Sequence, residues 1–244
     1  IVVSVASLPT PATCAMRTDP TAEADRLFDA NDYLALAKLL RGALTQQPDD
    51  PNLLWRLGRA CKKLADSEKP KSKAKEALIR EGVASTERAL ALDSLCGPVH
   101  KWHAILLSEV GEFDGTTATI KNSFTVRHHF EKAVELSPKD ATSRHLLGLW
   151  CFEIAKLTWI EKKACAAIFA SPPTASFEEA IGHFAAAEAM DPGFYPKNLL
   201  LLAMAHSKLG KKAESAEWRA KCLASNFITP EDEQTRKDAE LFSP

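Results

Sequence analysis

An all-α fold, built as a solenoid of stacked helix pairs, is predicted by the regular spacing of small and apolar residues along this sequence. One spacing places such residues at i, i+4 and i+7 and a helix-ending residue at i+12. It recurs at Leu36, Leu40, Ala43 and Pro48; at Gly82, Thr86, Ala89 and Ser94; at Val126, Phe130, Ala133 and Pro138; and at Ala180, Phe184, Ala187 and Pro192. Small residues let two helices approach closely, and proline cannot continue a helix. Each match therefore marks the second helix of a pair.

A related spacing marks the first helix of each pair, whose contact positions are filled in the order large, large, small and large. It occurs at Leu54, Leu57, Gly58 and Cys61; at His100, His103, Ala104 and Leu107; at Leu147, Gly148 and Cys151; and at Leu199, Leu202, Ala203 and His206. No segment shows the alternation of polar and apolar residues that indicates a strand. Two alternating helices of this kind are typical of tetratricopeptide repeats. We therefore expect a tetratricopeptide-like helical-repeat solenoid of about five helix pairs.

Long inserts separate the first and second helices of several predicted pairs. The helix-ending residues Pro48, Ser94, Pro138 and Pro192 lie further apart than the ~34 residues of a plain repeat. The additional residues are Lys62–Lys73, Gly115–Asn122 and Thr158–Pro173, and most of them have helical character. We expect paired helices that are longer than usual, including one long helix in the fourth unit.

Two capping patterns mark helix starts near the end of the chain. Ser176 with Glu179 predicts the start of a second helix. The run Thr229–Asp232 predicts a final helix that caps the stack. We expect residues 19–244 to form a single domain.

The first 18 residues are expected to form a flexible tail outside this domain. The stretch Ile1–Met16 is uncharged, which is consistent with the remnant of a targeting or anchoring segment. No stretch of the chain reaches the roughly 20 apolar residues needed to span a bilayer, so no transmembrane segment is predicted.

Composition and motifs indicate a protein without catalytic or cofactor chemistry. The formal net charge is -1 and the pI is about 6.7, so the chain as a whole does not attract nucleic acid or lipid head groups. The six cysteines form no Cys-x-x-Cys pair, and several occupy repeat positions, which predicts buried free thiols in a reducing compartment. Phosphate-binding loops, nucleophile elbows and zinc-protease motifs are absent from the sequence. We expect a protein that is not an enzyme and binds no cofactor.

A run of lysines is the strongest charge feature of the sequence. With Asp66 and Glu68, it carries a net charge of +4 over residues 62–75. The lysines are Lys62, Lys63, Lys69, Lys71, Lys73 and Lys75, and Lys162 with Lys163 forms a smaller basic spot. The run is either a solvated elbow between helices or a binding surface for an acidic polymer or an anionic lipid surface. No aromatic residue lies between the lysines of the run, so no nucleic-acid partner is predicted.

Two pairs of histidines are the candidate metal ligands of the sequence. His100 and His103 lie one helical turn apart, which is the minimal geometry for a metal site. Both occupy core positions of the repeat, which favours packed, hydrogen-bonded histidines. The neighbours His128 and His129 point in different directions on a helix. No metal site is predicted.

Several strings of residues, some of them within the inserts, resemble the regulator of microtubule dynamics family. They are Val99–Trp102, Ser108–Gly111, His129–Ala133, Ser137–Thr142, Gly148–Cys151, Ile168–Pro173 and Asp191–Leu202. The resemblance covers roughly residues 20–240. It implies a non-catalytic scaffold that associates with microtubules and acts at the mitotic spindle and its poles, in the cytoplasm on the cytoskeleton.

The same resemblance implies an alternative function. A membrane-anchored member of the family lies on the outer mitochondrial surface, binds phospholipid and tethers the mitochondrion to the endoplasmic reticulum. The partners expected for this chain are therefore the acidic tails of tubulin or, alternatively, a phospholipid at mitochondrial membrane contacts. A peptide-binding adaptor, with a protein segment in its concave groove, is a further alternative.

Overall fold

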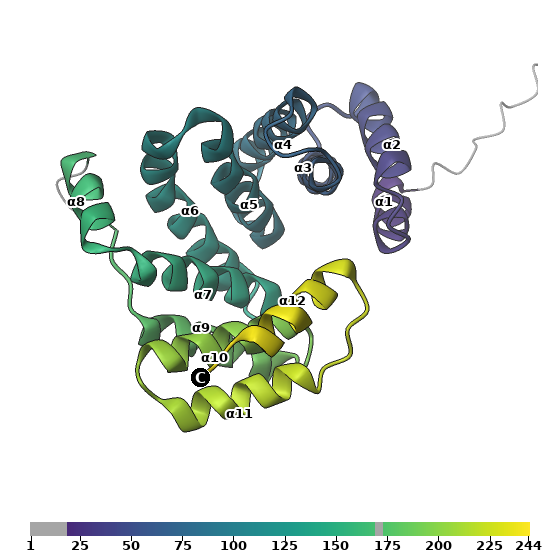
Figure 1. Cartoon of the computed structure of the whole chain (residues 1–244). Coiled ribbons are helices and arrows are strands. Elements are labelled where there is room, and N and C mark those ends of the chain that lie inside the picture. Colours follow the sequence, from purple (N-terminus) through teal and green to yellow (C-terminus); the bar gives the residue numbers. More distant parts are fainter. Residues whose placement is uncertain (1–18, 169–172) are drawn as a thin grey trace, which may run out of the picture.

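Helices joined by turns make up the part of the chain that the computed structural model describes, residues 19–168 and 173–244, and no strand occurs within those ranges (Figure 1). The helices are α1 (Pro20–Asp29), α2 (Tyr33–Gln46), α3 (Pro51–Asp66), α4 (Lys73–Leu92), α5 (Gly97–Asp114), α6 (Thr116–Leu136), α7 (Ala141–Lys156), α8 (Trp159–Ile168), α9 (Phe177–Met190), α10 (Pro196–Lys208), α11 (Lys212–Leu223) and α12 (Pro230–Leu241). The predicted all-α fold is confirmed.

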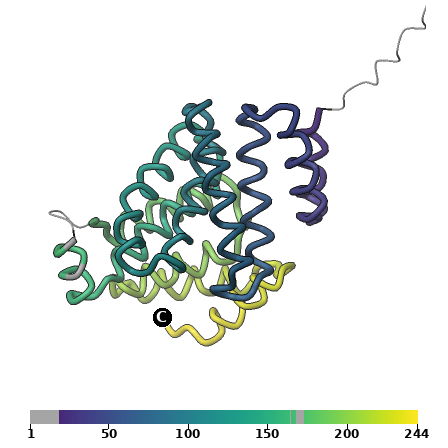
Figure 2. The backbone as a smooth tube through the Cα atoms, turned by 90° about the horizontal axis from the view of Figure 1, so that it is seen from above, coloured from purple at the N-terminus to yellow at the C-terminus, as the bar shows by residue number. Residues whose placement is uncertain are grey.

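The helices pack as pairs, and the pairs stack in chain order (Figures 1 and 2). The pairs are α1 with α2, α3 with α4, α5 with α6, α7 with α9, and α10 with α11. Successive pairs meet through α2 on α3, α4 on α5, α6 on α7 and α9 on α10. The final helix α12 packs on α10 and α11. This is the tetratricopeptide-like solenoid with a C-terminal capping helix that the repeat spacing predicts, because each unit buries its apolar face against its neighbours.

The residues of the repeat spacing form the core between the helices. Leu36, Cys61 and Phe184 are fully buried. A Cβ atom added at Gly58 would lie 2.5 Å from the Thr86 side chain, so the close approach of α3 to α4 requires a glycine there. The sequence interpretation of these positions as helix contacts is confirmed.

Side-chain caps begin several helices where the sequence predicts them. The hydroxyl of Thr229 accepts from the backbone N–H of Asp232, and the Asp232 carboxylate accepts from the Thr229 N–H, which forms a complete capping box. Ser176 accepts from the Glu179 N–H at 3.1 Å. The Glu179 carboxylate instead accepts from Arg127 on α6, so only half of that predicted capping box is present.

The third insert does not lengthen α7, so the expectation of one long helix in the fourth unit is wrong. The helix ends at Lys156, and Leu157 adopts a ψ of 128°, which turns the chain out of helical geometry. Thr158 then caps a separate helix, α8: its hydroxyl accepts from the Glu161 N–H at 3.4 Å, and the Glu161 carboxylate accepts from the Thr158 N–H at 2.8 Å. The first two inserts lengthen their helix pairs as predicted, and only Gly115 separates α5 from α6.

The predicted tail, residues 1–18, and Cys14 within it lie outside the described residues. The described cysteines are free thiols; Cys61, Cys151, Cys165 and Cys222 are buried as predicted, whereas Cys96 is only half-buried. Among the described helices, none has both the length and the hydropathy needed to cross a bilayer.

Candidate functional site: an apolar groove and a lysine turn

A groove of about 830 Å³ opens between helices from different pairs. Residues of α3, α5, α6, α7, the α9–α10 turn and α12 contribute to its walls. Apolar side chains from three of these helices line much of it: Ile105, Val126, Phe130, Leu146, Leu149 and Ile154. A groove of this size with a largely apolar lining is typical of sites that bind a ligand or a segment of a partner.

One end of the groove holds a buried histidine with a fixed orientation. The Nδ1 atom of His145 lies 2.9 Å from Asn198 Oδ1, and Asn198 Nδ2 donates to the Phe184 carbonyl at 3.0 Å. Because the amide nitrogen of Asn198 faces the Phe184 carbonyl, the amide oxygen of Asn198 faces His145. The Nδ1 atom of His145 therefore carries the proton and donates it to that oxygen. Burial lowers the pKa of His145. This histidine is therefore a neutral, structural part of the groove wall.

Three of the hydroxyls that line the groove are used by their own helices. Ser108, Thr119 and Ser123 each donate to a backbone carbonyl three or four residues earlier. The hydroxyl of Tyr195, which also lines the groove, donates to the Glu231 carboxylate of α12. These four hydroxyls therefore make hydrogen bonds that hold the groove wall together.

The structure divides the predicted lysine cluster into two groups. Lys62 bonds to Asp66 on its own helix and to Glu109 on α5 at 2.8 Å. Lys75 bonds to Glu112 on α5 at 2.5 Å. Both lysine side chains are less than one-fifth exposed. Their charges join α3 and α4 to α5 and are compensated within the chain.

The second group lies at the turn between α3 and α4 and points outward. Lys69, Lys71 and Lys73 are exposed, and none forms an ion pair with another described residue. Lys71 has a φ of 56°, and its N–H donates to Glu112, which fixes the shape of the turn. We call these three residues the lysine turn. Lys63 is half-buried and contributes to the groove wall.

The smaller basic spot lies elsewhere on the molecule. Lys162 and Lys163 are exposed on α8. This helix lies apart from α3 and α4 in both views (Figures 1 and 2). The two predicted basic regions therefore form separate surfaces.

The predicted core histidines form a cluster that also includes His129. His100 Nε2 faces the Ser94 carbonyl at 3.0 Å and must donate to it, so its Nδ1 accepts from Nδ1 of His129 at 2.8 Å when both rings are neutral. The ring of His103 packs edge-on against that of His129, with ring centroids 4.8 Å apart. The side chains are hydrogen-bonded core groups, as the repeat positions indicate; the role of His129 could not be predicted, because its partners lie on another helix.

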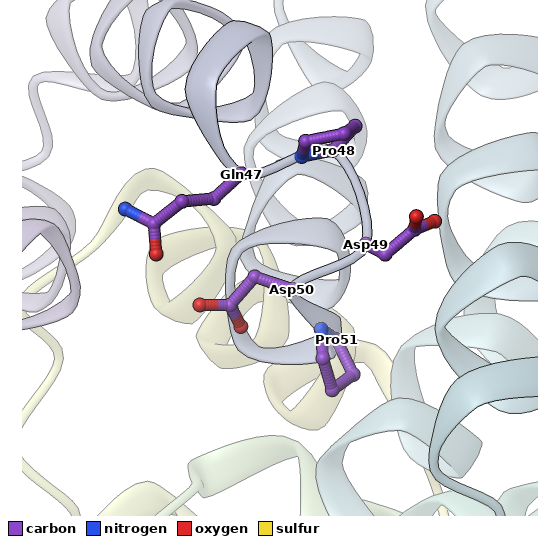
Figure 3. Close-up of a pocket in the computed structure, with 5 residues that line it drawn as sticks. All are labelled: Gln47, Pro48, Asp49, Asp50 and Pro51. Atoms are coloured by element: carbon purple, nitrogen blue, oxygen red, sulfur yellow. The ribbon is translucent and has the colours of Figure 1, made fainter.

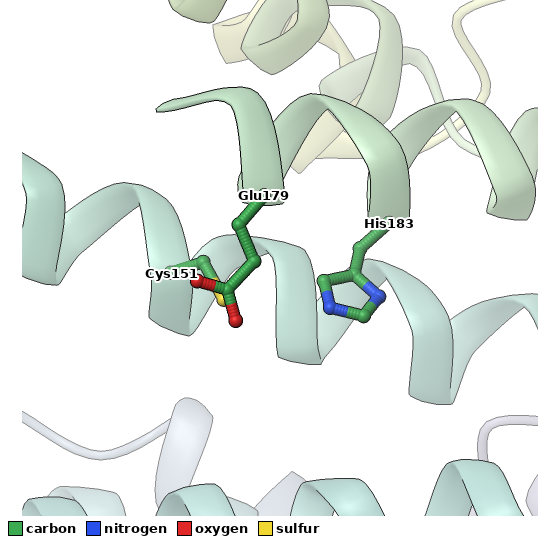
Figure 4. Close-up of side chains that lie close together, drawn as sticks. All are labelled: Cys151, Glu179 and His183. Carbon is green, nitrogen blue, oxygen red and sulfur yellow. The ribbon is translucent and has the colours of Figure 1, made fainter. Parts of the chain in front are cut away.

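Cys151, Glu179 and His183 bring three ligand-type atoms within 4.8 Å of one another (Figure 4). Burial and, to a smaller extent, the nearby Glu179 carboxylate raise the pKa of the Cys151 thiol to about 12. The Glu179 carboxylate is already paired with the Arg127 guanidinium at 3.0 Å. A protonated thiol and an arginine-paired carboxylate are poor ligands for a metal ion.

The same arrangement recurs in an earlier repeat, which identifies its structural origin. There, Arg41 of α2 pairs with Glu81 of α4 at 2.7 Å beside the buried Cys61 of α3. Ser85 occupies the position that corresponds to His183. The arginine, cysteine and glutamate thus form a polar link between successive helix pairs, and the histidine is a variable addition to it.

A second hollow lies at the turn between α2 and α3, lined by Gln47, Pro48, Asp49, Asp50 and Pro51 (Figure 3). Asp49 accepts from Arg88 on α4 at 2.5 Å. Asp50 accepts from the Asn52 N–H at 2.8 Å and caps α3. Both carboxylates therefore have structural partners within the chain.

Comparison with known proteins identifies relatives over nearly the whole chain. A family model described as "Regulator of microtubule dynamics protein 1-3" matches residues 21–243. Regulator of microtubule dynamics protein 1 of Mus musculus is 39% identical over 218 residues, which cover 89% of this chain and 71% of that protein. Regulator of microtubule dynamics protein 3 of Mus musculus is 32% identical over 189 residues, 78% of this chain and 40% of that protein.

Solved structures support the fold but share little sequence with the chain. A thermophilic tetratricopeptide protein of Thermus thermophilus, TTC0263, superposes with a TM-score of 0.63 at 16% identity and covers 91% of this chain and 98% of its own. YrrB, described as a tetratricopeptide protein with an unusual peptide-binding site, gives a TM-score of 0.54 at 14% identity, with 91% of each chain covered. Together with the family match, these comparisons establish that the chain belongs to the regulator of microtubule dynamics family and has a tetratricopeptide-like fold.

Proposed function

We propose that the chain is a non-catalytic scaffold that associates with microtubules, including those of the mitotic spindle. The observation that carries this proposal is the lysine turn, which presents three exposed ammonium groups, none in an ion pair with a described residue. Tubulin has acidic tails, which offer the complementary charge. The family to which the chain belongs supports the same partner. This function places the chain in the cytoplasm on the cytoskeleton.

Co-sedimentation with purified microtubules tests the proposal. Reversal of the lysine turn (Lys69→Glu, Lys71→Glu and Lys73→Glu) should weaken binding by about tenfold, since each exposed ion pair contributes up to about 1 kcal/mol. Binding should also weaken as salt increases, because exposed charges are screened.

The turn between α10 and α11 offers a matched control. Lys208, Lys211 and Lys212 are also three exposed lysines at an inter-helix turn. Their reversal produces the same change in net charge and should leave pelleting nearly unchanged. Equal losses from the two turns would mean that only the overall charge matters, and unchanged pelleting of the first variant would remove the lysine turn from the site.

A second candidate function rests on the groove, whose largely apolar lining could bind a protein segment or an acyl chain of a phospholipid. The phospholipid interpretation connects the chain to mitochondrial membrane contacts. Native mass spectrometry of the purified chain distinguishes the two occupants. Co-purified phospholipid, displaced when Leu149→Glu introduces a charge into the groove, would support lipid binding. A ligand-free mass together with retained binding of partner peptides would favour an adaptor.

A further inference from the structure

The helix α8 carries two large apolar side chains that the rest of the described protein leaves uncovered. Trp159 is 68% exposed and Ile160 is 73% exposed. The helix projects from the body of the solenoid and packs mainly on α6 (Figures 1 and 2). Cys165, which is 5% exposed, is its buried residue. Exposed tryptophan and isoleucine side by side indicate a surface that meets a partner.

The outward face of α8 combines these apolar groups with positive charge. At about 3.6 residues per turn, Trp159, Lys162, Lys163 and Ala166 fall on one side of the helix, with Ile160 at its edge. The Lys163 ammonium lies 3.9 Å from the centroid of the Trp159 ring. We call these five residues the α8 face.

The one acidic side chain of α8 does not lie on this face. Glu161 lies on the opposite side of the helix with Cys165 and accepts hydrogen bonds from Thr158 at 2.8 and 2.7 Å. The Glu161 carboxylate is therefore hydrogen-bonded at the start of α8. The α8 face therefore carries two lysines and no acid among its members.

We propose that the α8 face docks on the surface of an anionic lipid bilayer. Tryptophan is enriched at the membrane–water boundary, where its ring lies at the level of the head groups. Lysine stems can lie along apolar surface while the ammonium groups remain beside lipid phosphates. A protein partner would need pockets that accept two projecting side chains, whereas a bilayer accepts a convex helix laid on it. The helix lies on the membrane in this arrangement and does not cross it.

Vesicle co-sedimentation of the whole chain tests the proposal directly. Vesicles of phosphatidylcholine and phosphatidylserine in equal amounts should bind the chain, and vesicles of phosphatidylcholine alone should bind it at least about tenfold more weakly. Two double variants remove the two components of the face: Trp159→Ser with Ile160→Ser, and Lys162→Glu with Lys163→Glu. Each should weaken binding to the mixed vesicles by about tenfold or more.

Matched control variants come from exposed apolar residues elsewhere. Ile228 is 80% exposed and Leu241 is 86% exposed. The double variant Ile228→Ser with Leu241→Ser should bind the mixed vesicles as the unchanged chain does. All of these positions are exposed, so thermal unfolding of each variant should match that of the unchanged chain and show that the fold is retained.

Tryptophan fluorescence gives a readout at the residue itself. Trp55 and Trp150 are less than one-tenth exposed, and Trp102 and Trp218 are half-buried, so vesicles should shift the emission of the exposed Trp159 most. The shift to shorter wavelength should disappear in Trp159→Phe, while that variant still binds the vesicles.

Three results would overturn the proposal. One is failure of the unchanged chain to bind either type of vesicle. Another is full vesicle binding by both α8 double variants. The third is loss of microtubule pelleting in these variants without any vesicle binding, which would assign the α8 face to a protein partner. The variants of the lysine turn leave α8 unchanged, so the two surfaces are tested separately.

Discussion

His100 and His129 share one hydrogen bond between their Nδ1 atoms, which lie 2.8 Å apart. One ring donates this hydrogen bond and the other accepts it. The pair can therefore bind one additional proton. A second additional proton would place two N–H groups against each other. Burial and, to a smaller extent, the neighbouring His103 lower the pKa of His129 to about 4. Burial and the charge of His100 lower the pKa of His103 to about 4 as well.

The histidine cluster should make the folded state sensitive to mild acid. A histidine with a pKa near 6.5 in the unfolded chain and near 4 in the folded chain binds more protons when unfolded. Stability is therefore fully present above about pH 6.5 and falls as the pH decreases toward 4. We expect the free energy of unfolding, measured in urea, to fall by on the order of 2 kcal/mol between pH 7 and pH 5. His129→Gln, which cannot titrate, should reduce this slope; an unchanged slope would contradict the assignment.

Two glycines should respond in opposite ways to the same substitution. A Cβ atom at Gly58 would lie 2.5 Å from Thr86 Cγ2, so Gly58→Ala should lower the free energy of unfolding by about 1–3 kcal/mol. A Cβ atom at Gly42, in the exposed middle of α2, would meet nothing within 4 Å. Gly42→Ala should therefore raise the free energy of unfolding by about 1 kcal/mol. Urea titrations measure both, and equal signs would contradict the packing of α3 against α4.

The repeat spacing predicts most of the fold because each contact between paired helices needs the same pattern of small and apolar residues. Gly58 and Thr86 are recognisable in the sequence, since a small residue recurs wherever two helices cross closely. The division of the third insert at Leu157 was not predictable in this way. Its residues have helical propensity on both sides, and the break depends on one backbone dihedral and a cap at Thr158.

The candidate site was less accessible to sequence analysis than the fold. The lysine run is visible in the sequence, and so is Asp66, one partner of Lys62. The partners of Lys62 and Lys75 on α5 lie more than 30 residues further along. Only the packing of α5 on α3 and α4 shows which lysines remain uncompensated. The groove likewise combines side chains from several helix pairs, and no local pattern connects Ile105 with Leu149.

Asn198 should tolerate neither alanine nor aspartate at neutral pH. The residue is fully buried, and Asn198→Ala leaves His145 Nδ1 without a partner, so unfolding should become easier by about 2–3 kcal/mol. In Asn198→Asp, a carboxylate oxygen replaces the amide nitrogen that donates to the Phe184 carbonyl at 3.0 Å. Two oxygen atoms then face each other. Burial raises the pKa of such an acid. The aspartate variant should regain stability relative to the alanine variant as the pH falls, because the protonated acid can donate to Phe184; parallel pH profiles would contradict this geometry.

The buried thiols should resist modification until the chain unfolds. Burial raises the pKa of Cys61 to about 12 and that of Cys222 to about 11, so neither forms the reactive thiolate at neutral pH. Cys96 is only half-buried and should react first with a disulfide reagent such as Ellman's reagent. Cys14→Ser removes the thiol outside the described residues, so the remaining rates report the folded domain. Rapid reaction of Cys61 or Cys222 in the native state would contradict their burial.

Cys151, Glu179 and His183 should not bind a transition-metal ion, although their ligand atoms lie within 4.8 Å of one another. Arg127 holds the Glu179 carboxylate, and the thiol of Cys151 remains protonated, so a metal would have to displace both an arginine and a proton. The corresponding cysteine, glutamate and arginine recur at Cys61, Glu81 and Arg41 without a histidine. Added Co²⁺ should therefore produce no thiolate-to-metal absorption, and Zn²⁺ should not raise the melting temperature. His183→Ser, which copies Ser85 of the earlier repeat, should change stability by less than about 1 kcal/mol. A thiolate absorption band that disappears in Cys151→Ser would show that the cluster is a metal site after all.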